Sequence, residues 1–214
     1  TADPQAAHVH YNRAMLLLSM GRFDEGWAEY EWRLRCREFV LRRLPAPAWN
    51  GEPLEEKTLL VHAEQGQGDT IQFLRYLPLV RARCPHTLFE VLAALLPICR
   101  QSGIDGLIEQ PEPVKGVYAA PAAEYDYQVS LLSLPHIFRT TLESIPANVP
   151  YLSPADELVA AWRTKLSDRP GFRIGICWQG SPTHRDDQVR SFPLTNFARL
   201  ARVDGVRLFS LQKG

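Results

Sequence analysis

Apolar residues near the start of the chain recur at the spacing of a helix. One stripe ends at Gly21, and a second follows it at intervals of four, three and four residues. The first stripe includes Tyr11, Met15 and Leu18, and the second comprises Phe23, Trp27, Tyr30 and Leu34. The pattern predicts an antiparallel helical hairpin over residues 1–43, with the last three residues of the second stripe packed on the first stripe.

The hydrophobic pattern changes after a Pro-rich connector at residues 44–57. Short apolar runs typical of strands then alternate with helical patterns, one of them running from about residue 69 to 83 with Phe73, Tyr76, Leu77 and Val80 on its apolar face. The expected strands are 58–63, 87–92, 106–110 and the start of 125–135. Strands alternating with helices predict an α/β domain over residues 58–153, in which helices cover both faces of a parallel sheet.

A second α/β unit is expected from residue 154 to 214. A helical pattern leads into "FRIGICW", a continuous apolar run that predicts a buried strand, and a further helix and strand follow. Because a domain that begins in this way normally continues well past one β-α-β unit, we expect the chain to be the front part of a longer protein.

Composition narrows the class of protein. The chain has 24 Lys plus Arg and 24 Asp plus Glu, so its net charge is zero, which argues against nonspecific nucleic-acid binding. Its four cysteines are scattered without a C-x-x-C pair, so neither a zinc site nor a disulfide framework is expected. No apolar run approaches the length of a membrane span. We expect a cytoplasmic protein without a metal.

The stretch "HAEQGQGDTIQF" contains the first candidate site. Its Gly66-x-Gly68 spacing has Ile71 where a dinucleotide fingerprint needs a third glycine, and it lacks the Lys-Ser/Thr of a P-loop. What remains is a glycine turn after a strand, with Asp69 in the first turn of a helix. Such a strand end is where open α/β sheets bind ligands, but an aspartate there is also a favoured helix cap. Both interpretations of Asp69 stay open.

The loop "QGSPTHRDDQVRSFP" is the second candidate. It follows an apolar strand and carries hydroxyl groups and two arginines, Arg185 and Arg190, which suit an anion such as a diphosphate. Lys213, which follows the next strand, could reach the same sheet edge. The alternative is an ordinary polar surface loop.

These residues resemble known families. "GRFDEGWAEY" is similar to the second half of a tetratricopeptide repeat, with Gly21 at the turn and Gly26 at a small-residue position. "GDTIQFLRYLPLVRARCP" is similar to the start of the heptosyltransferase family of glycosyltransferases, through Gly68, Asp69 and Pro78 among others. "RSFP" differs from that family's Lys-x-Trp-Pro pattern. The combination resembles bacterial tetratricopeptide-repeat proteins with a heptosyltransferase-like domain.

The resemblance implies a GT-B architecture, in which both α/β regions are Rossmann-like. It also implies transfer of a sugar from a nucleotide sugar to an acceptor hydroxyl, with no cofactor beyond that co-substrate. By that resemblance Asp69 matches the base that deprotonates the acceptor. The neighbouring residues expected to bind substrate are Gly66, Gln67, Gly68 and Thr70, and those expected to meet the donor phosphates are Gly180, Ser181, Arg185, Arg190 and Lys213. We expect this chain alone to be inactive, because most of the donor domain would lie beyond Gly214.

A non-catalytic alternative stays open as well. The parent could be a tetratricopeptide scaffold that binds protein or peptide partners through its helical repeats, with a transferase-like domain that has lost catalysis.

Overall fold

The computed structural model describes residues 4–36, 42, 44–111, 118–180 and 187–212. The chain divides into two compact units, Thr1–Pro154 and Ala155–Gly214. The first contains a helical hairpin and a four-stranded parallel sheet with its helices, and the second contains a two-stranded parallel sheet. The coarse expectation of an α/β protein with a parallel sheet is therefore confirmed.

The hairpin consists of α1 (Pro4–Ser19) and α2 (Phe23–Tyr30), continued by the 3-10 helix η1 (Glu31–Arg35). Gly21 ends α1 with a φ of 76°, a conformation that glycine adopts without a steric penalty. Its N–H donates to the carbonyl of Leu18, and the N–H of Arg22 donates to the carbonyl of Leu17, the paired bonds of a Schellman motif. Gly26 is needed for close packing, since a Cβ there would lie 2.7 Å from Leu18 Cδ2.

The hairpin prediction was right in part. Tyr30 is buried, and Tyr11, Leu18 and Trp27 pack against the same apolar core. Met15 and Leu34, in contrast, are 49% and 37% exposed. Both lie on the sides of their helices that turn away from the common core, which the four-three spacing alone does not reveal.

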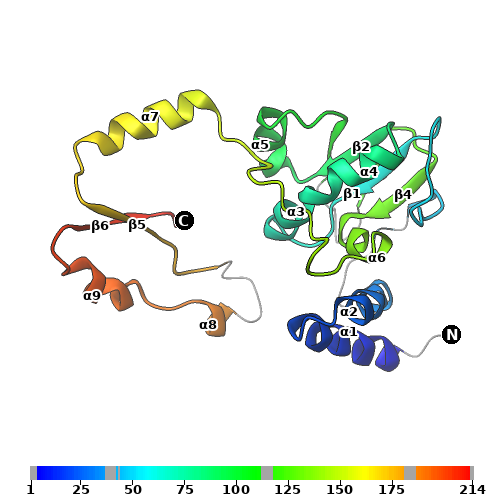
Figure 1. The fold of residues 1–214 in the computed structure, drawn as a ribbon, viewed down its shortest axis with the longest axis horizontal. Helices are drawn as coiled ribbons and strands as arrows, with labels where there is room; N and C mark the ends of the chain where they lie inside the picture. The colour runs from blue at the N-terminus through cyan, green and yellow to red at the C-terminus, as the bar shows by residue number, and fades with distance from the viewer. Residues whose placement is uncertain (1–3, 37–41, 43, 112–117, 181–186, 213–214) are drawn as a thin grey trace. The chain divides into compact units, whose positions relative to one another are not determined.

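All four strands of the first unit run parallel, in the order β3-β2-β1-β4. Their bounds are β1 (Leu59–His62), β2 (Thr87–Val91), β3 (Leu107–Glu109) and β4 (Tyr127–Ser130). β1 pairs with β2 so that His62 lies opposite Glu90, and it pairs with β4 so that His62 lies opposite Ser130. The carboxyl ends of the strands therefore meet at one edge (Figure 1).

Side chains alternate between the two faces of this sheet. One face is apolar and joins the helices in a single core, through Leu59, Val61, Phe89, Val91 and Val129. The predicted helix 69–83 is in fact three pieces: α3 (Gln67–Phe73), the 3-10 turn η2 (Leu74–Tyr76) and α4 (Leu77–Arg83). Pro78 stands in the first turn of α4, where its missing N–H costs no helical hydrogen bond. The apolar face predicted for this segment is buried as expected, and Arg75 and Arg81 are partly exposed.

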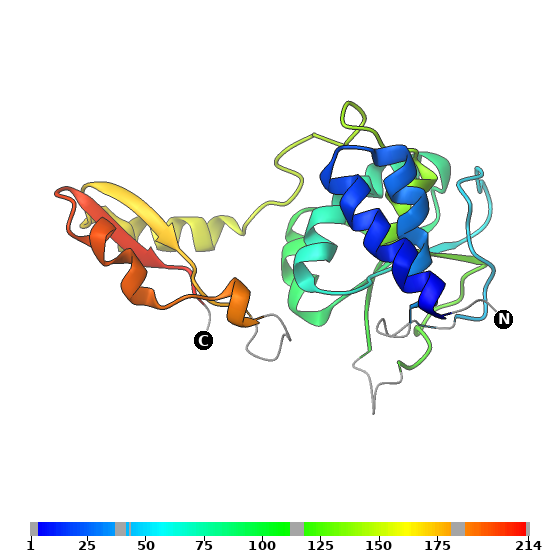
Figure 2. The ribbon, with the colours of Figure 1, turned by 90° about the horizontal axis from the view of Figure 1, so that it is seen from below.

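The remaining helices of the first unit follow β2 and β4. They are η3 (Ala93–Leu95) with α5 (Leu96–Gln101), and η4 (Leu131–Ser133) with α6 (Leu134–Ile137). The hairpin contacts α6 through α2, and Figures 1 and 2 show it along the side of the sheet unit where α6 lies.

The second sheet face differs from the expectation of helices on both sides. Toward the carboxyl edge it is polar: Glu90 pairs with Arg42, whose guanidinium lies over the ring of Tyr118, and neither Arg42 nor Tyr118 is helical. The buried polar side chains on this face are His62, Glu90 and Ser130. Polar groups of this kind need hydrogen-bonding partners, which an apolar helix face does not provide.

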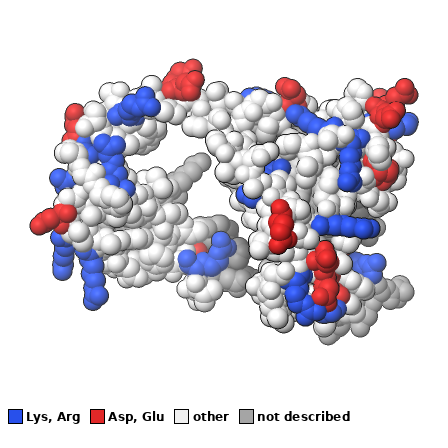
Figure 3. All heavy atoms as spheres, viewed as in Figure 1, with Lys and Arg blue, Asp and Glu red and all other residues white. Residues whose placement is uncertain are grey.

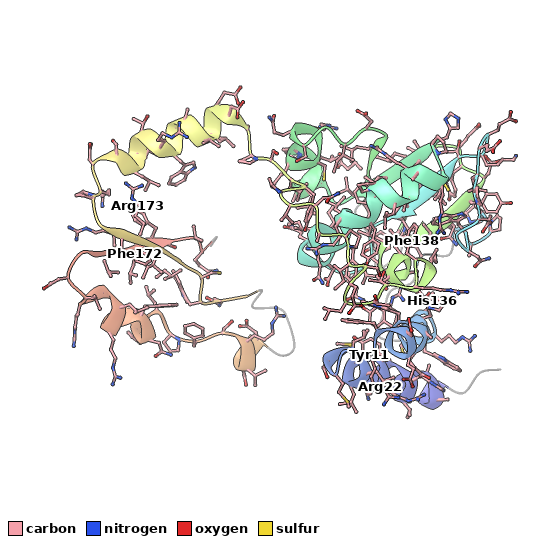
Figure 4. The ribbon with its side chains drawn as sticks, viewed as in Figure 1. Tyr11, Arg22, His136, Phe138, Phe172 and Arg173 are labelled. Carbon is pink, nitrogen blue, oxygen red and sulfur yellow. The ribbon has the colours of Figure 1, made fainter. Side chains whose placement is uncertain are left out.

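The second unit contains α7 (Asp156–Ser167), α8 (Asp187–Arg190), η5 (Leu194–Phe197), α9 (Ala198–Ala201) and the paired strands β5 (Phe172–Ile176) and β6 (Val206–Ser210). β5 was expected to be buried, but only Ile176 is, and Phe172 is 70% exposed. A sheet of two strands has too little surface to bury both of its faces. Figure 4 labels Phe172 and Arg173 on this strand.

Trp27 connects the hairpin to the sheet domain. Its ring meets Phe73 of α3 edge-on at 6.2 Å and Tyr30 at 5.9 Å between ring centroids. We expect Trp27→Ala to lower the free energy of unfolding by about 3 kcal/mol, the usual effect of truncating a large aromatic in a core. Chemical denaturation measures this, and Trp162→Ala, at a 56% exposed tryptophan of α7, should change it by less than about 0.5 kcal/mol. Equal effects of the two substitutions would contradict the assignment of Trp27 as a contact between hairpin and sheet.

Candidate functional site

The strand order reverses between β1 and β4, since β2 and β3 follow on one side of β1 and β4 lies on the other. In open α/β sheets the crevice at the carboxyl ends of two such strands is the usual place for a ligand. A cavity of about 450 Å³ lies there. Its lining comes from three parts of the chain. The end of β1 and the residues after it contribute His62, Ala63, Glu64 and Gln65. The end of β4 and the segment after it contribute Gln128, Ser130, Ser133 and His136, and η1 of the hairpin contributes Glu31 and Leu34. Figure 4 shows His136 where the hairpin and the sheet domain meet.

A buried arginine from the hairpin forms one wall of this site. Arg33 is fully buried, and its Nε and Nη2 donate to the two carboxylate oxygens of Glu64 at 2.9 and 2.8 Å. Its Nη1 donates to Glu31 at 2.6 Å, and its Nη2 also donates to the Ser133 hydroxyl at 2.8 Å. The two-pronged pairing with a carboxylate suits the planar fork of a guanidinium.

The same carboxylates bond to the segment after β4. The Ser133 hydroxyl donates to Glu31 at 2.9 Å, and the Ser130 hydroxyl donates to Glu64. Segments that lie about a hundred residues apart in the chain, η1 and η4, are therefore joined through one guanidinium and two carboxylates. This network holds Glu31 at the cavity.

Burial and pairing oppose each other at this network. For Arg33, burial lowers the pKa, but its hydrogen bonds and the charges of Glu64 and Glu31 outweigh burial and leave the pKa raised. For Glu64, burial raises the pKa, but hydrogen bonds and the charge of Arg33 outweigh it and leave the pKa lowered. Both groups are therefore charged at neutral pH.

A second polar row crosses the sheet face beside this network. His62 Nε2 lies 3.0 Å from the side-chain oxygen of Gln128, and Gln110 donates to the carbonyl of Ala63 at 3.4 Å. Burial lowers the pKa of His62, so the ring is neutral at pH 7. Glu90, on the neighbouring strand β2, pairs with Arg42, and burial raises the pKa of the Glu90 carboxyl.

The Glu90–Arg42 pair is incompletely satisfied. Glu90 Oε1 and Arg42 Nε are buried and have no hydrogen-bond partner among the described residues. Unpaired buried polar atoms are rare in native proteins and usually have a functional or solvent-related reason.

The turn in "HAEQGQGDT" was expected to depend on its two glycines, but its backbone reverses at another residue. The residue in the left-handed region is Gln65, with a φ of 65°. Gly66 is extended with a φ of −93°. Gly68 lies inside α3, and a Cβ there would meet nothing within 4 Å. The glycines were expected to be needed because a Cβ would crowd the turn or an approaching substrate. For the turn this is wrong at Gly68, because the backbone reverses one residue before the glycines, and for a substrate it stays a prediction.

Asp69 caps α3. Its carboxylate accepts the N–H of Gly66 at 2.9 Å, and Gly66 precedes the first helical residue, Gln67. Thr70 is buried, and its hydroxyl donates to the carbonyl of Gly66 at 3.1 Å, so it serves the start of the helix. Gly66, Gln67 and Gly68 are exposed. The cavity is lined by Glu64 and Gln65, directly before the predicted substrate-binding residues.

Of the predicted phosphate-binding residues, the structure brings two together. Gly180 lies beside Arg190 of α8, since a Cβ built on Gly180 would be 3.9 Å from Arg190 Nη2. The N–H of Gly180 donates to the Ser191 hydroxyl at 3.1 Å. Ser181, Arg185 and Lys213 lie outside the described residues.

Sequence reasoning missed the residues that line the cavity, chiefly Glu31, His62, Glu64, Gln110 and Gln128. A signal was available for most of them, because they stand at or just after the ends of predicted strands that share one edge. Glu31 and Arg33 gave no such signal, since they belong to the helical pattern of the hairpin and not to a strand end.

No three His, Cys, Asp or Glu residues within the described ranges cluster in a way that could hold a metal ion. None of the helices described is both long and apolar enough to cross a membrane. The fold and the cavity thus define an α/β protein whose parallel sheet carries a polar crevice closed on one side by a helical hairpin.

Comparison with known proteins gives one relative and no family. The chain is 27% identical over 222 residues to the Protein FlbA of Caulobacter vibrioides (strain ATCC 19089 / CIP 103742 / CB 15). The match covers 97% of this chain and 37% of that protein, so the chain spans little more than a third of its relative. No protein-family model and no solved structure matches the chain.

Removing the buried guanidinium should destabilise the first unit strongly. We expect Arg33→Ala to lower the free energy of unfolding by about 3–5 kcal/mol, because Glu64 is left buried without its partner. Arg13→Ala is the control: Arg13 is 53% exposed and pairs with Glu29 at 2.6 Å, so its loss should cost less than about 1 kcal/mol. Urea unfolding of both variants measures the difference, and similar losses would refute the role of Arg33.

His62 should make stability depend on pH. Its folded pKa lies below the ordinary value of 6.5, so its contribution is complete above pH 6.5 and is lost as the pH falls below it. The loss is at most about 1.4 kcal/mol per pH unit. Glu90, whose pKa is raised, acts in the opposite direction at acidic pH. We therefore expect the free energy of unfolding of the wild type, relative to His62→Gln, to fall between pH 7.5 and 5.5. Parallel curves would contradict this prediction.

Proposed function

We propose that the complete protein is a metal-independent glycosyltransferase of the GT-B type, in which the first unit holds the acceptor and the second belongs to the donor side. The observation that supports this most is the cavity at the reversal of strand order between β1 and β4. A polar crevice at that point is typical of α/β enzymes that bind sugars and nucleotides. The resemblance of "GDTIQFLRYLPLVRARCP" to heptosyltransferases points to the same reaction.

In this proposal Asp69 is the general base for the acceptor hydroxyl. It follows the cavity residue Gln65 by four positions and is only partly buried. Gly66, Gln67 and Gly68 would let an acceptor approach the start of α3. Gly180 and Arg190, together with Ser181, Arg185 and Lys213, would bind the diphosphate of the donor. The nucleotide sugar is the only co-substrate, and the expected cytoplasmic location remains part of the proposal.

One observation favours the scaffold alternative. α1 exposes Val9, Met15 and Leu16, and Met20 directly after it is exposed as well, which gives the hairpin an apolar surface of the kind that neighbouring repeats or peptides cover. A tetratricopeptide-like hairpin with such a surface could bind protein partners whether or not the α/β units are catalytic.

Nucleotide-sugar binding distinguishes the two functions. A donor present at 100 times its Kd stabilises a folded protein by about 2.7 kcal/mol, which is several degrees of Tm for domains of this size. We therefore expect one member of a panel of nucleoside diphosphate sugars to raise the Tm of the complete protein. A panel without any stabilising member would favour the scaffold.

Asp69→Asn tests the base. The amide oxygen of asparagine can still accept the N–H of Gly66, so we expect the Tm to stay within about 2 °C of the wild type. Turnover in the complete protein should nonetheless fall about 100-fold or more, because an amide cannot take up the proton. Asp105→Asn, at an exposed aspartate after α5, should leave turnover unchanged. Wild-type turnover in Asp69→Asn would reduce Asp69 to a helix cap.

A further inference from the structure

The two described guanidinium groups beside the crevice are directed at protein oxygens. Every guanidinium nitrogen of Arg33 donates to protein oxygens, on Glu64, Glu31, Ser130, Ser133 and the Tyr30 backbone. Arg42 donates one terminal nitrogen to Glu90 and the other to the carbonyl of Ala119, and its Nε is buried without a hydrogen-bond partner among the described residues. A guanidinium binds phosphate best through two parallel N–H groups that face the ligand. In both arginines the terminal nitrogens already face protein oxygens.

Among the described residues, carboxylates outnumber guanidiniums near the crevice. Glu31, Glu64 and Glu90 are three carboxylates, and within the described part of the chain Arg33 and Arg42 pair with them. Glu31 is the most exposed of the three, with 26% of its side chain accessible. An anionic ligand would meet this carboxylate and be repelled at short range. Figure 3 shows acidic and basic side chains interspersed over the visible face of the first unit, so its outer surface adds no strong field of one sign there.

What the cavity offers a ligand is neutral hydrogen bonding beside apolar surface. Each oxygen of Glu31 carries one protein hydrogen bond, and a carboxylate has room for about two more. The amides that line the cavity are Asn50, Gln65, Gln110 and Gln128, and its apolar lining includes Leu34, Trp49 and Ile137. Carboxylate and amide groups bond hydroxyls in both directions, and apolar side chains contact the C–H faces between them.

We propose that this crevice binds a neutral, hydroxyl-rich sugar unit, that Glu31 of the helical hairpin contacts it directly, and that phosphorylated sugars are excluded. In the proposed transferase reaction this sugar unit is the acceptor. Its role as acceptor rests on the proposed function, whereas its binding in the crevice does not. The hairpin is then part of the acceptor site, because Arg33 fixes the segment that places Glu31 at the cavity.

Saturation-transfer NMR with millimolar ligands tests the proposal on the protein itself. The probes are neutral monosaccharides, namely glucose, galactose, mannose and N-acetylglucosamine, and the anionic match glucose 6-phosphate. We expect at least one neutral sugar to give transfer signals and the 6-phosphate to bind at least about tenfold more weakly than glucose. Absence of signals from every neutral sugar, or equal binding of the phosphate, would overturn the proposal.

Two pairs of variants locate the binding. Ala48→Phe places a ring in the cavity from an exposed position on its rim, whereas Ala46→Phe adds the same ring outside it. Only the first should abolish the signals, with the Tm of both variants confirming that they fold. Glu31→Gln should reduce discrimination against glucose 6-phosphate, and Glu29→Gln, on the hairpin but outside the cavity, should not. Signals that survive Ala48→Phe would place the sugar elsewhere.

The two proposals fail separately in these experiments. Neutral-sugar binding without any stabilisation by nucleoside diphosphate sugars would keep the crevice assignment and remove the transferase. The opposite result is stabilisation by a nucleotide sugar that persists in Ala48→Phe, without neutral-sugar binding in the wild type. That result would keep the transferase and remove the crevice assignment.

Discussion

The first unit depends on one buried guanidinium. The Arg33 guanidinium ends among Glu31 of η1, Glu64 of the loop after β1 and Ser133 of the turn after β4. Removing such a charge from water is costly, and its pairing with Glu64 offsets that cost only while the geometry is held. The main effect of the interaction is therefore to select one arrangement of hairpin and sheet, and its net contribution to the free energy of unfolding is smaller. That arrangement places Glu31 in the wall of the cavity.

The two faces of the parallel sheet differ in character: one packs in the apolar core, and the other carries polar side chains toward the cavity. Leu59, Val61 and Phe89 point into the core with the helices, and the alternate residues His62 and Glu90 point to the opposite side. A shift of register by one residue would exchange these sets. The apolar face thus fixes the position of the polar one, and the carboxyl edge collects polar groups from β1, β2 and β4 where the strand order reverses.

The two units differ in how much of their apolar surface they bury. Nearly all of the buried core belongs to the first unit, and the second buries little besides Ile176. The strand of the second unit that reads as the most apolar, β5, has Phe172 largely exposed. The described contact at the predicted donor site is polar, between the N–H of Gly180 and the hydroxyl of Ser191.

Local pattern by itself determined the element types and much of the core. Helical spacing predicted the hairpin, alternating strands and helices predicted the parallel sheet, and the apolar face from Phe73 to Val80 was assigned correctly, because these signals depend on neighbours within a few residues. The sequence could also place Asp69 in the first turn of a helix, but it could not separate a cap from a base.

Tertiary structure decided where the cavity lies and which residues line it. Glu31 and Arg33 stand in the helical pattern of the hairpin, and Glu64 stands at the start of a glycine turn. Arg33 nonetheless pairs with Glu64 across a chain separation of more than thirty residues. Even the turn itself reverses at Gln65 and not at the glycines. The physical reason is that the site is made by contacts between residues far apart in the chain. The periodicity of apolar residues reports only on near neighbours, so it does not show which distant residues meet.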